Sequence, residues 1–469
     1  MADNAEFQVL PSNPPLGMLV ATDKVTHSGD ANAEVQLMRQ VHVTGAEGSK
    51  TPVEITSAEG LLVNLGSNND VKISFSDGAA VGAFGRMRVQ NPTTLFDSQQ
   101  QYDKGRVYWE EKITGSASTT HLPNESSVLL TVTANATDAV KRQSREYLRY
   151  QPGKGQEVIN TSDFGAAVSG VFKRYGYYDD DNGAYMEQTA TGVYQVVLRS
   201  KRTGSVVNSE ITQANWNIDT LDGTGASGVT LDGTKSAIAV IDLQWLAAGR
   251  VRCGFEISGI LHYVHEFNHA NISTGAYMTT ANLPCRYEIG TDGTNGGTFQ
   301  TICSTVISEG GFDTSRGSRF SASNGATMLA VTTRRPILSV RPKLTFNSIV
   351  NRGLFIPDGI RSFTEDKAAF FEVVYGGTLT NASWASVNAD SIVEADVAAT
   401  AISGGIVVDS WSTDKKADVA LDTLSRYPLT LDIDGAHPTS PYTDSYSLVA
   451  TTLTTATDCT GTILWPEFR

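Results

Sequence analysis

Most of this chain consists of short runs in which apolar and polar residues alternate, each run ending at Gly, Asn or Asp. In residues 249–259, GRVRCGFEISG, an apolar side chain stands at every second position from Val251 to Ile257. A repeat of two is typical of an antiparallel strand that buries one face. The 43 glycines supply the turns that close such strands. The pattern therefore predicts a chain built from antiparallel sheets.

Helical patterns are rare in comparison. Only residues 414–426, DKKADVALDTLSR, have apolar residues at i and i+4, and the segment is short. We find no repeat of 20–50 residues, which argues against propellers and solenoids. The sequence predicts an all-β, multidomain β-sandwich protein of the jelly-roll or lectin-like type, with short helices only.

The chain has 469 residues, enough for several buried cores. We expect a polar N-terminal arm at 1–12, a small β module at 13–80 and a central β-sandwich at 81–310. A Gly- and Ser-rich stretch at 311–334 is expected to be a linker or a surface arm. A C-terminal β-sandwich is expected at 335–469.

Charge and composition exclude several classes of protein. The net charge is −14 and the isoelectric point about 5.0, which argues against a nucleic-acid binder with a basic stripe. We expect no signal peptide, because the first residues have no basic stretch followed by an apolar one, and we expect no transmembrane segment, because no apolar run has the length to span a membrane. Cys253, Cys285, Cys303 and Cys459 form no CxxC pair, so we expect reduced, buried thiols and no zinc ribbon.

Residues 265–270, HEFNHA, match the HExxH pattern of zinc proteases. On a helix, His265 and His269 could share one zinc ion while Glu266 acts as general base. On a strand, the two histidines would be roughly 13 Å apart, too far for Zn–N bonds of ~2.0–2.1 Å. The local alternation favours a strand, so a zinc hydrolase is a remote alternative. A regular strand would place five side chains on one face: Leu261, Tyr263, His265, Phe267 and His269.

Other polar groups have weaker patterns. Residues 179–181 are three aspartates, which suit Ca²⁺, but Tyr178 occupies the first EF-hand ligand position, so we expect a hairpin tip at Asn182-Gly183. Residues 149–156, RYQPGKGQ, lack the phosphate-loop pattern and indicate a Pro-Gly turn. The adjacent Glu110 and Glu111 should point to opposite strand faces, the wrong geometry for an acid/base pair.

The remaining candidates are basic and aromatic side chains. Four basic residues could contact an acidic partner, although a charged outer face is the simpler interpretation: Lys141, Arg142, Arg145 and Arg149. Six tryptophans could line a glycan groove, although buried core positions are more common: Trp109, Trp216, Trp245, Trp384, Trp411 and Trp465. We assign no catalytic, cofactor-binding or metal-binding residue, and we expect no enzymatic activity.

Several long strings, in order, resemble structural proteins of tailed-bacteriophage virions. The strings are RMRVQNPTTLFDSQ (86–99), RYQPGKGQ (149–156), DLQWLAAGRVRCGFEISGILHYVHEFNHAN (242–271), YMTTANLPCRYEIG (277–290) and NRGLFIPDG (351–359). The resemblance covers about 81–375. It implies a virion structural protein and no catalytic residues.

From the resemblance we expect a tail, neck or tail-attached protein that assembles by multivalent subunit contacts, with module 13–80 attached to the virion. The alternatives are a receptor- or carbohydrate-binding virion protein and a head-decorating capsid protein. The expected partners are other virion proteins and copies of the chain itself, with a host surface glycan for the binding alternative. Localisation in the virion, after assembly in the host bacterial cytoplasm, follows from the same resemblance.

Overall fold

The computed structural model describes residues 81–469 apart from 86, 89–90, 314–316, 326–328, 417, 422–426, 428 and 440–442. Before residue 81 it describes only β1 (Val25–Thr26) and β2 (Glu34–Val35), which pair antiparallel. The chain divides into two units, Met1–Ser74 and Phe75–Arg469. The arm predicted at 1–12 and most of the module predicted at 13–80 therefore lie outside the described residues.

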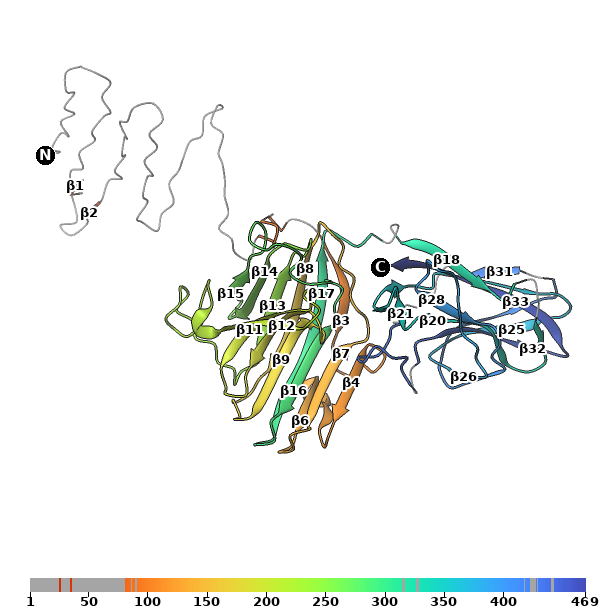
Figure 1. The fold of residues 1–469 in the computed structure, drawn as a ribbon, viewed down its shortest axis with the longest axis horizontal. Helices are drawn as coiled ribbons and strands as arrows, with labels where there is room; N and C mark the ends of the chain where they lie inside the picture. The colour runs from red at the N-terminus through yellow and green to blue at the C-terminus, as the bar shows by residue number, and fades with distance from the viewer. Residues whose placement is uncertain are drawn as a thin grey trace, which may run out of the picture. The chain divides into compact units, whose positions relative to one another are not determined.

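The central sandwich consists of two antiparallel sheets (Figure 1). The seven-stranded sheet has the order β12 (Val207–Thr212), β11 (Tyr194–Ser200), β10 (Gly183–Gln188), β9 (Val171–Tyr178), β16 (Cys285–Thr291), β7 (Ala139–Ser144) and β4 (Trp109–Thr114). The eight-stranded sheet has the order β15 (Ile260–Phe267), β14 (Val251–Ile257), β13 (Ala237–Leu243), β8 (Gly155–Asp163), β17 (Gly297–Glu309), β6 (Ser127–Val132) and β5 (Ser118–Leu122), and β3 (Pro92–Ser98) also pairs with β17.

The core lies between these two sheets because alternate residues of each strand point inward. On β14, Val251, Cys253 and Phe255 are buried in it, as the alternation predicts. Its middle is aromatic: the ring of Tyr175 stacks against Tyr287 at 6.1 Å, and Phe299 lies 6.0 Å from both. Such large rings bury much apolar area, so this core holds the two sheets in a fixed relation.

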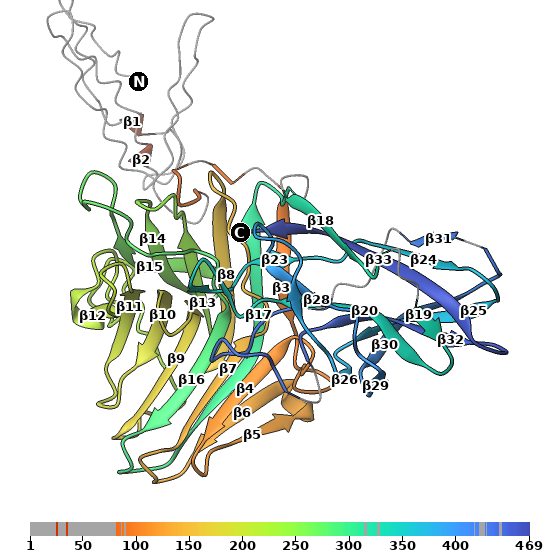
Figure 2. The ribbon, with the colours of Figure 1, turned by 45° about the vertical axis from the view of Figure 1, so that its right-hand side comes forward.

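The C-terminal sandwich also has two main sheets (Figure 2). One contains β18 (Ser318–Ser323), β33 (Thr457–Phe468), β24 (Gly359–Thr364) and β31 (Asp418–Leu421), with β19 (Leu329–Val331) and β23 (Leu354–Phe355) also paired to β33. The other has the order β27 (Ala385–Ser386), β28 (Val393–Asp396), β20 (Arg335–Pro342), β32 (Tyr446–Thr452), β25 (Ala369–Tyr375) and β30 (Ile406–Thr413). Two small hairpins are β21 (Thr345–Phe346) with β22 (Ile349–Val350), and β26 (Thr378–Thr380) with β29 (Ala401–Ser403).

The predicted fold class is confirmed: the chain is all-β, with sandwiched antiparallel sheets. Two local expectations differ. Part of the segment 311–334 forms β18 and β19 and belongs to the C-terminal sheet, because both strands pair with the long β33. Within 414–426, residues 418–421 form β31, because β24 offers that segment a ladder partner.

Helical structure is minor throughout the described part of the chain. It consists there of two single 3₁₀ turns, η1 (Pro123–Glu125) and η2 (Gln213–Asn215). Within the residues that the structure describes, no helix has the length and apolarity to cross a bilayer.

Candidate functional site

The HExxH segment lies on a strand. His265 and Glu266 belong to β15, which pairs antiparallel with β14, and His269 follows the end of that strand. The helix that would bring both imidazoles to one metal ion is not formed. Across residues 81–469, gaps excluded, no group of three or more His, Cys, Asp or Glu side chains could hold a metal ion.

Each member of the HExxH segment has a separate partner. The backbone N–H of Asn217 donates to Nδ1 of His265 at 3.2 Å. The Nδ1–H of His269 donates to the carbonyl of Gly249 at 2.7 Å, and Glu266 forms an ion pair with Arg250 at 3.1 Å. Burial lowers the pKa of both histidines. These are the contacts of structural histidines that stay neutral near pH 7.

A β-bulge corrects the predicted faces of this strand. Cys253 lies opposite His265, and the next residue, Gly254, lies opposite Tyr263, so Val264 is an extra residue on β15. Consecutive residues of β14 point to opposite faces, and therefore His265 and Tyr263 do too. The prediction that Leu261, Tyr263, His265 and Phe267 share one face is wrong. The bulge directs Tyr263 to the outer face of the sheet.

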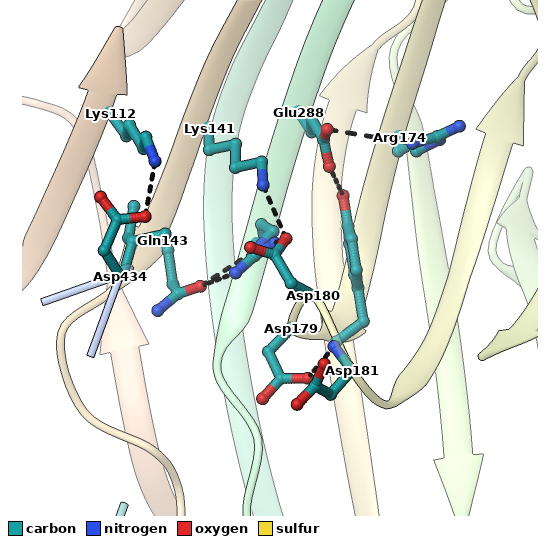
Figure 3. A network of polar contacts seen from close by, with 12 residues as sticks. Lys112, Lys141, Gln143, Arg174, Asp179, Asp180, Asp181, Glu288 and Asp434 are labelled. Atoms are coloured by element: carbon teal, nitrogen blue, oxygen red, sulfur yellow. Dashed lines mark hydrogen bonds and ion pairs between the residues drawn. The ribbon is translucent and has the colours of Figure 1, made fainter. Parts of the chain in front are cut away.

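The three aspartates of the β9–β10 loop serve different partners (Figure 3). Oδ1 of Asp179 accepts from the backbone N–H groups of Asp181 and Asn182, at 2.8 and 2.7 Å. The Asp180 carboxylate binds Lys141 and Arg286, and Asp181 binds Lys201 at 2.9 Å. The opposing charges of the Lys141 and Arg286 side chains overcome burial and lower the pKa of Asp180.

The hairpin prediction is confirmed in substance, since β9 and β10 pair antiparallel with Tyr178 opposite Gly183. The loop therefore comprises residues 179–182, and Gly183 opens β10 with a φ of 130°. An added Cβ would collide with the backbone of Tyr178, so this position requires glycine.

The outer face of the seven-stranded sheet is a layer of tyrosine and arginine side chains. Tyr178 on β9 and Tyr185 on β10 are fully buried, and their rings pack in a tilted arrangement with centroids 4.4 Å apart. The guanidinium of Arg199 lies 5.1 Å from the Tyr185 ring, and that of Arg286 lies 5.3 Å from the Tyr178 ring. Arg174 lies over the Tyr185 ring at 5.6 Å. These contacts are cation–π interactions, and they cover the tyrosine rings with flat, charged groups.

Two carboxylates in this layer are joined by one arginine. Arg174 forms an ion pair with Glu187 at 2.7 Å and a longer one with Glu288 at 3.8 Å. The hydroxyl of Tyr178 donates to Glu288 at 3.3 Å, and Gln195 donates to Glu187 at 2.5 Å. Burial alone would lower the pKa of Arg174, but the two carboxylates more than offset it and raise that pKa. Arg174, on β9, therefore joins carboxylates from the two strands that flank it, β10 and β16.

A second charged cluster covers the outer face of the eight-stranded sheet. Oδ2 of the buried Asp242 accepts from Arg252 at 2.5 Å, from Arg88 at 2.6 Å and from the Tyr263 hydroxyl at 3.2 Å. Arg88 also binds Glu157 at 2.5 Å and Glu309 at 3.2 Å. A lone Arg88 therefore connects three carboxylates on three different strands, β13, β8 and β17.

A cavity of about 470 Å³ adjoins this cluster. Its lining includes Phe84, Met87, Arg88, Lys154, Ile307 and Glu309. Burial raises the pKa of Glu309. A side chain at Gly155 would collide with that carboxylate, so glycine leaves it room. No local sequence pattern indicates this cluster, because its members come from distant strands.

The remaining predicted residues do not gather into a site. Three tryptophans are buried in the two cores, Trp109, Trp216 and Trp465, and three are half-buried, Trp245, Trp384 and Trp411. Glu110 accepts from the N–H of Ile433 at 3.1 Å, while Glu111 pairs with the buried Arg142 at 2.5 Å. They therefore serve separate partners.

The basic residues and cysteines also have structural surroundings. Lys141 binds Asp180, Arg145 donates to the carbonyl of Arg106, and Arg149 donates to that of Arg469. RYQPGKGQ forms a turn before β8, in which Lys154 binds the carbonyl of Gly311 at 2.7 Å. All four cysteines are free in the structure. Cys253, Cys285 and Cys459 are buried as expected, whereas Cys303 is half-buried.

No family model matches the sequence, and no curated protein matches it. Solved structures do show likeness. A glycosyl hydrolase family 16 protein from Mycobacterium smegmatis is 9% identical, with 46% of this chain and 100% of that chain covered and a TM-score of 0.32. The binding domain of botulinum neurotoxin serotype D/C is 8% identical, with 62% and 61% covered and a TM-score of 0.29. At these values the likeness carries no argument about this chain.

Proposed function

We propose that this chain is a structural component of a tailed-bacteriophage virion, a tail, neck or tail-attached protein that assembles by multivalent subunit contacts and performs no catalysis. The observation that carries the proposal is that carboxylates on the sheet faces form ion pairs with arginine side chains. Asp180, Glu187, Glu288, Asp242 and Glu157 each bind an arginine, so they stiffen the sheet faces. Paired charges of this kind serve a rigid subunit better than they serve proton transfer, which needs a carboxyl group able to change its charge.

The sequence resemblance supports the same proposal, because four of its five strings contribute to the central sandwich. Residues 242–271 contain β14 and β15, and residues 277–290 contain most of β16. RYQPGKGQ leads into β8. A rigid sandwich of this kind offers strand edges and loops for contacts between subunits in a particle.

The direct test is protein mass spectrometry of particles. Phage particles from a lysate of the strain that encodes the chain are purified on a density gradient, and the peptides in the particle band are compared with those in the free host cytosol. We expect peptides of this chain in the particle band at a fixed ratio to other virion proteins. Their absence from that band would contradict the proposal.

Two further readouts separate the alternatives. Native mass spectrometry of the purified chain should show subunits without zinc. One zinc per chain, lost in His265→Ala, would instead favour the zinc hydrolase. Binding of the chain to host-cell polysaccharide would favour the receptor- or carbohydrate-binding role. Antibodies against the chain should label isolated tails if it is a tail protein and isolated heads if it decorates the head.

A further inference from the structure

The strand at one end of the seven-stranded sheet, β12, is exposed on both faces. It is the last strand in the order of its sheet and lies at the outer side of β11 in Figure 2. Residues 201–210 are all exposed, and Val206 and Val207 expose 43% and 53% of their surface. Only the end of the strand is anchored, since Ile211 packs against the central core. Backbone hydrogen bonds to β11 are therefore the main interactions that hold β12 in the sheet.

Other end strands of the central sandwich are covered by the chain itself. The outer edge of β15 is closed by residues 217–219. The N–H groups of Ile218 and Asp219 donate to the carbonyl of Val264 at 3.0 and 3.2 Å. The Asn217 amide binds both the N–H and the carbonyl of Glu266, at 2.9 and 3.0 Å. This loop satisfies the edge as a neighbouring strand would.

The edges of β5 and β3 are also protected. Lys104 donates to the carbonyl of Thr119 on β5 at 2.7 Å, and the His121 ring binds the carbonyl of Gln100 at 2.7 Å. β3 begins at Pro92 and has a bulge opposite β17. Proline and bulges are devices by which natural sheets prevent unwanted pairing at an edge.

The edge strand β4 binds residues from the C-terminal part of the chain. Lys112 forms an ion pair with Asp434 at 2.5 Å, and Glu110 accepts from the N–H of Ile433 at 3.1 Å (Figure 3 shows the first contact). In this way β4 is also engaged within the subunit.

None of the residues that the structure describes covers the β12 edge in a comparable way. Within the part of the chain that the structure describes, the backbone of residues 207–210 makes hydrogen bonds only in the ladder with β11. Further along the strand, the carbonyl of Ile211 accepts a hydrogen bond from the Trp216 indole at 3.1 Å. An edge without proline, lysine, bulge or cover is a template for another strand.

We infer that β12 pairs with β12 of a second copy of this chain, antiparallel about a two-fold axis through Ser209, so that the two seven-stranded sheets become continuous. Residues that pair across two antiparallel strands lie on the same face of the sheet. A two-fold axis perpendicular to the sheet must therefore relate a residue to its own copy, because an axis between two consecutive residues would pair side chains of opposite faces. Val207, Ser209 and Ile211 share the face toward the core, and Asn208 and Glu210 share the outer face.

This register gives complementary pairs on both faces. Val207 lies opposite Ile211 of the second copy, an apolar pair, and Asn208 lies opposite Glu210, an amide that can donate to a carboxylate. Glu210 is the only charged residue of β12, and it would meet its own copy only if the axis passed through Glu210. The inference is independent of the proposed virion role, because it depends on the strand alone.

The test uses charges that oppose each other only in the dimer. In Ser209→Lys the new ammonium groups would meet at the two-fold axis, and in Ser209→Glu the new carboxylates would. In the monomer both side chains are exposed to water. We expect each variant to raise the dissociation constant of the dimer by about tenfold or more, which corresponds to about 1.4 kcal/mol, because like charges directly opposite each other on paired strands repel. An equimolar mixture should restore dimers that contain one chain of each kind.

The measurement is sedimentation velocity of the full chain over a range of concentrations, with native mass spectrometry for the mixture. Ser118→Lys is the matched control, an exposed residue on the covered edge strand β5, and it should dimerise as the wild type does. Equal melting temperatures would show that Ser209→Lys folds normally. A wild-type chain that stays monomeric, a trimer, or a Ser209→Lys variant that dimerises like the wild type would each overturn the inference.

Discussion

Asp242→Asn should destabilise the central sandwich strongly, because one buried carboxylate oxygen serves two arginines. Asp242 and Arg252 are both almost completely buried, and Arg88 binds the same oxygen. The asparagine has nearly the same shape, so the variant removes charge and leaves packing intact. Two guanidinium groups would then keep their desolvation cost without the carboxylate that compensates for it.

The expected magnitude follows from the remaining partners. Removing one partner of a buried ion pair costs about 3–5 kcal/mol. Arg88 keeps Glu157 and Glu309, and Arg252 keeps the backbone carbonyl of Val81, so we expect the lower end, about 3 kcal/mol. For a domain of this size, 1 kcal/mol corresponds to roughly 2–4 °C, so the melting temperature should fall by about 6–12 °C.

The assay is differential scanning calorimetry of the wild type and two variants. The control is Asp434→Asn, which removes the ion pair between Asp434 and Lys112. The Asp434 side chain is 57% exposed, and ion pairs at the surface contribute about 0–1 kcal/mol. Urea unfolding followed by fluorescence gives the free energy independently. If Asp242→Asn shifts the transition no more than Asp434→Asn does, the cluster does not stabilise the sandwich as we argue.

Three further predictions concern single sites. Burial lowers the pKa of His265 and His269 below the ordinary 6.5, so the unfolded chain binds protons more readily and stability should be full above that pH and fall below it. His265→Asn should reduce the loss of unfolding free energy between about pH 8 and about pH 5.5, and an unchanged loss would refute this assignment. Burial raises the pKa of Cys253 and Cys285 to about 12, so iodoacetamide should label them only after unfolding, as mass spectrometry can show; labelling of the native chain would mean that they are accessible. Gly183→Ala should cost at least about 1 kcal/mol in urea unfolding, because the new Cβ meets the Tyr178 backbone, whereas wild-type stability would indicate a relaxed loop.

The sequence predicted those parts of the fold that depend on local periodicity. The alternation in residues 249–259 specifies β14 and its buried face, and the same pattern argued correctly against a helix at HEFNHA. The bulge at Val264 could not be predicted, because it depends on how β15 aligns with its neighbour and not on the alternation within β15. Segment 318–323 was predicted to be part of a linker or surface arm for a similar reason: its ladder partner, β33, lies more than a hundred residues later.

The charged clusters escaped prediction because they join residues that are distant in sequence. Arg88 and Asp242 are 154 residues apart, and Arg88 and Glu157 are 69 apart. Arg252 occupies an outward-facing position of the alternating strand, yet it is buried and binds the Asp242 carboxylate and the carbonyl of Val81. Sequence periodicity assigns a residue to a face of its strand, but it does not tell what else covers that face.

Substitutions on the outer faces and at the β12 edge of the central sandwich should therefore have different effects, the first on stability and the second on dimer formation. If the outer faces supply stability, Asp242→Asn lowers the melting temperature and leaves the association constant per folded chain unchanged. If the β12 edge supplies association, Ser209→Lys weakens the dimer and leaves the melting temperature of the monomer unchanged, because Ser209 is exposed. The double variant should show both effects with little coupling, since the two sites share no contact and distant sites usually add. A strong coupling between them would mean that the charged face itself takes part in the subunit contact.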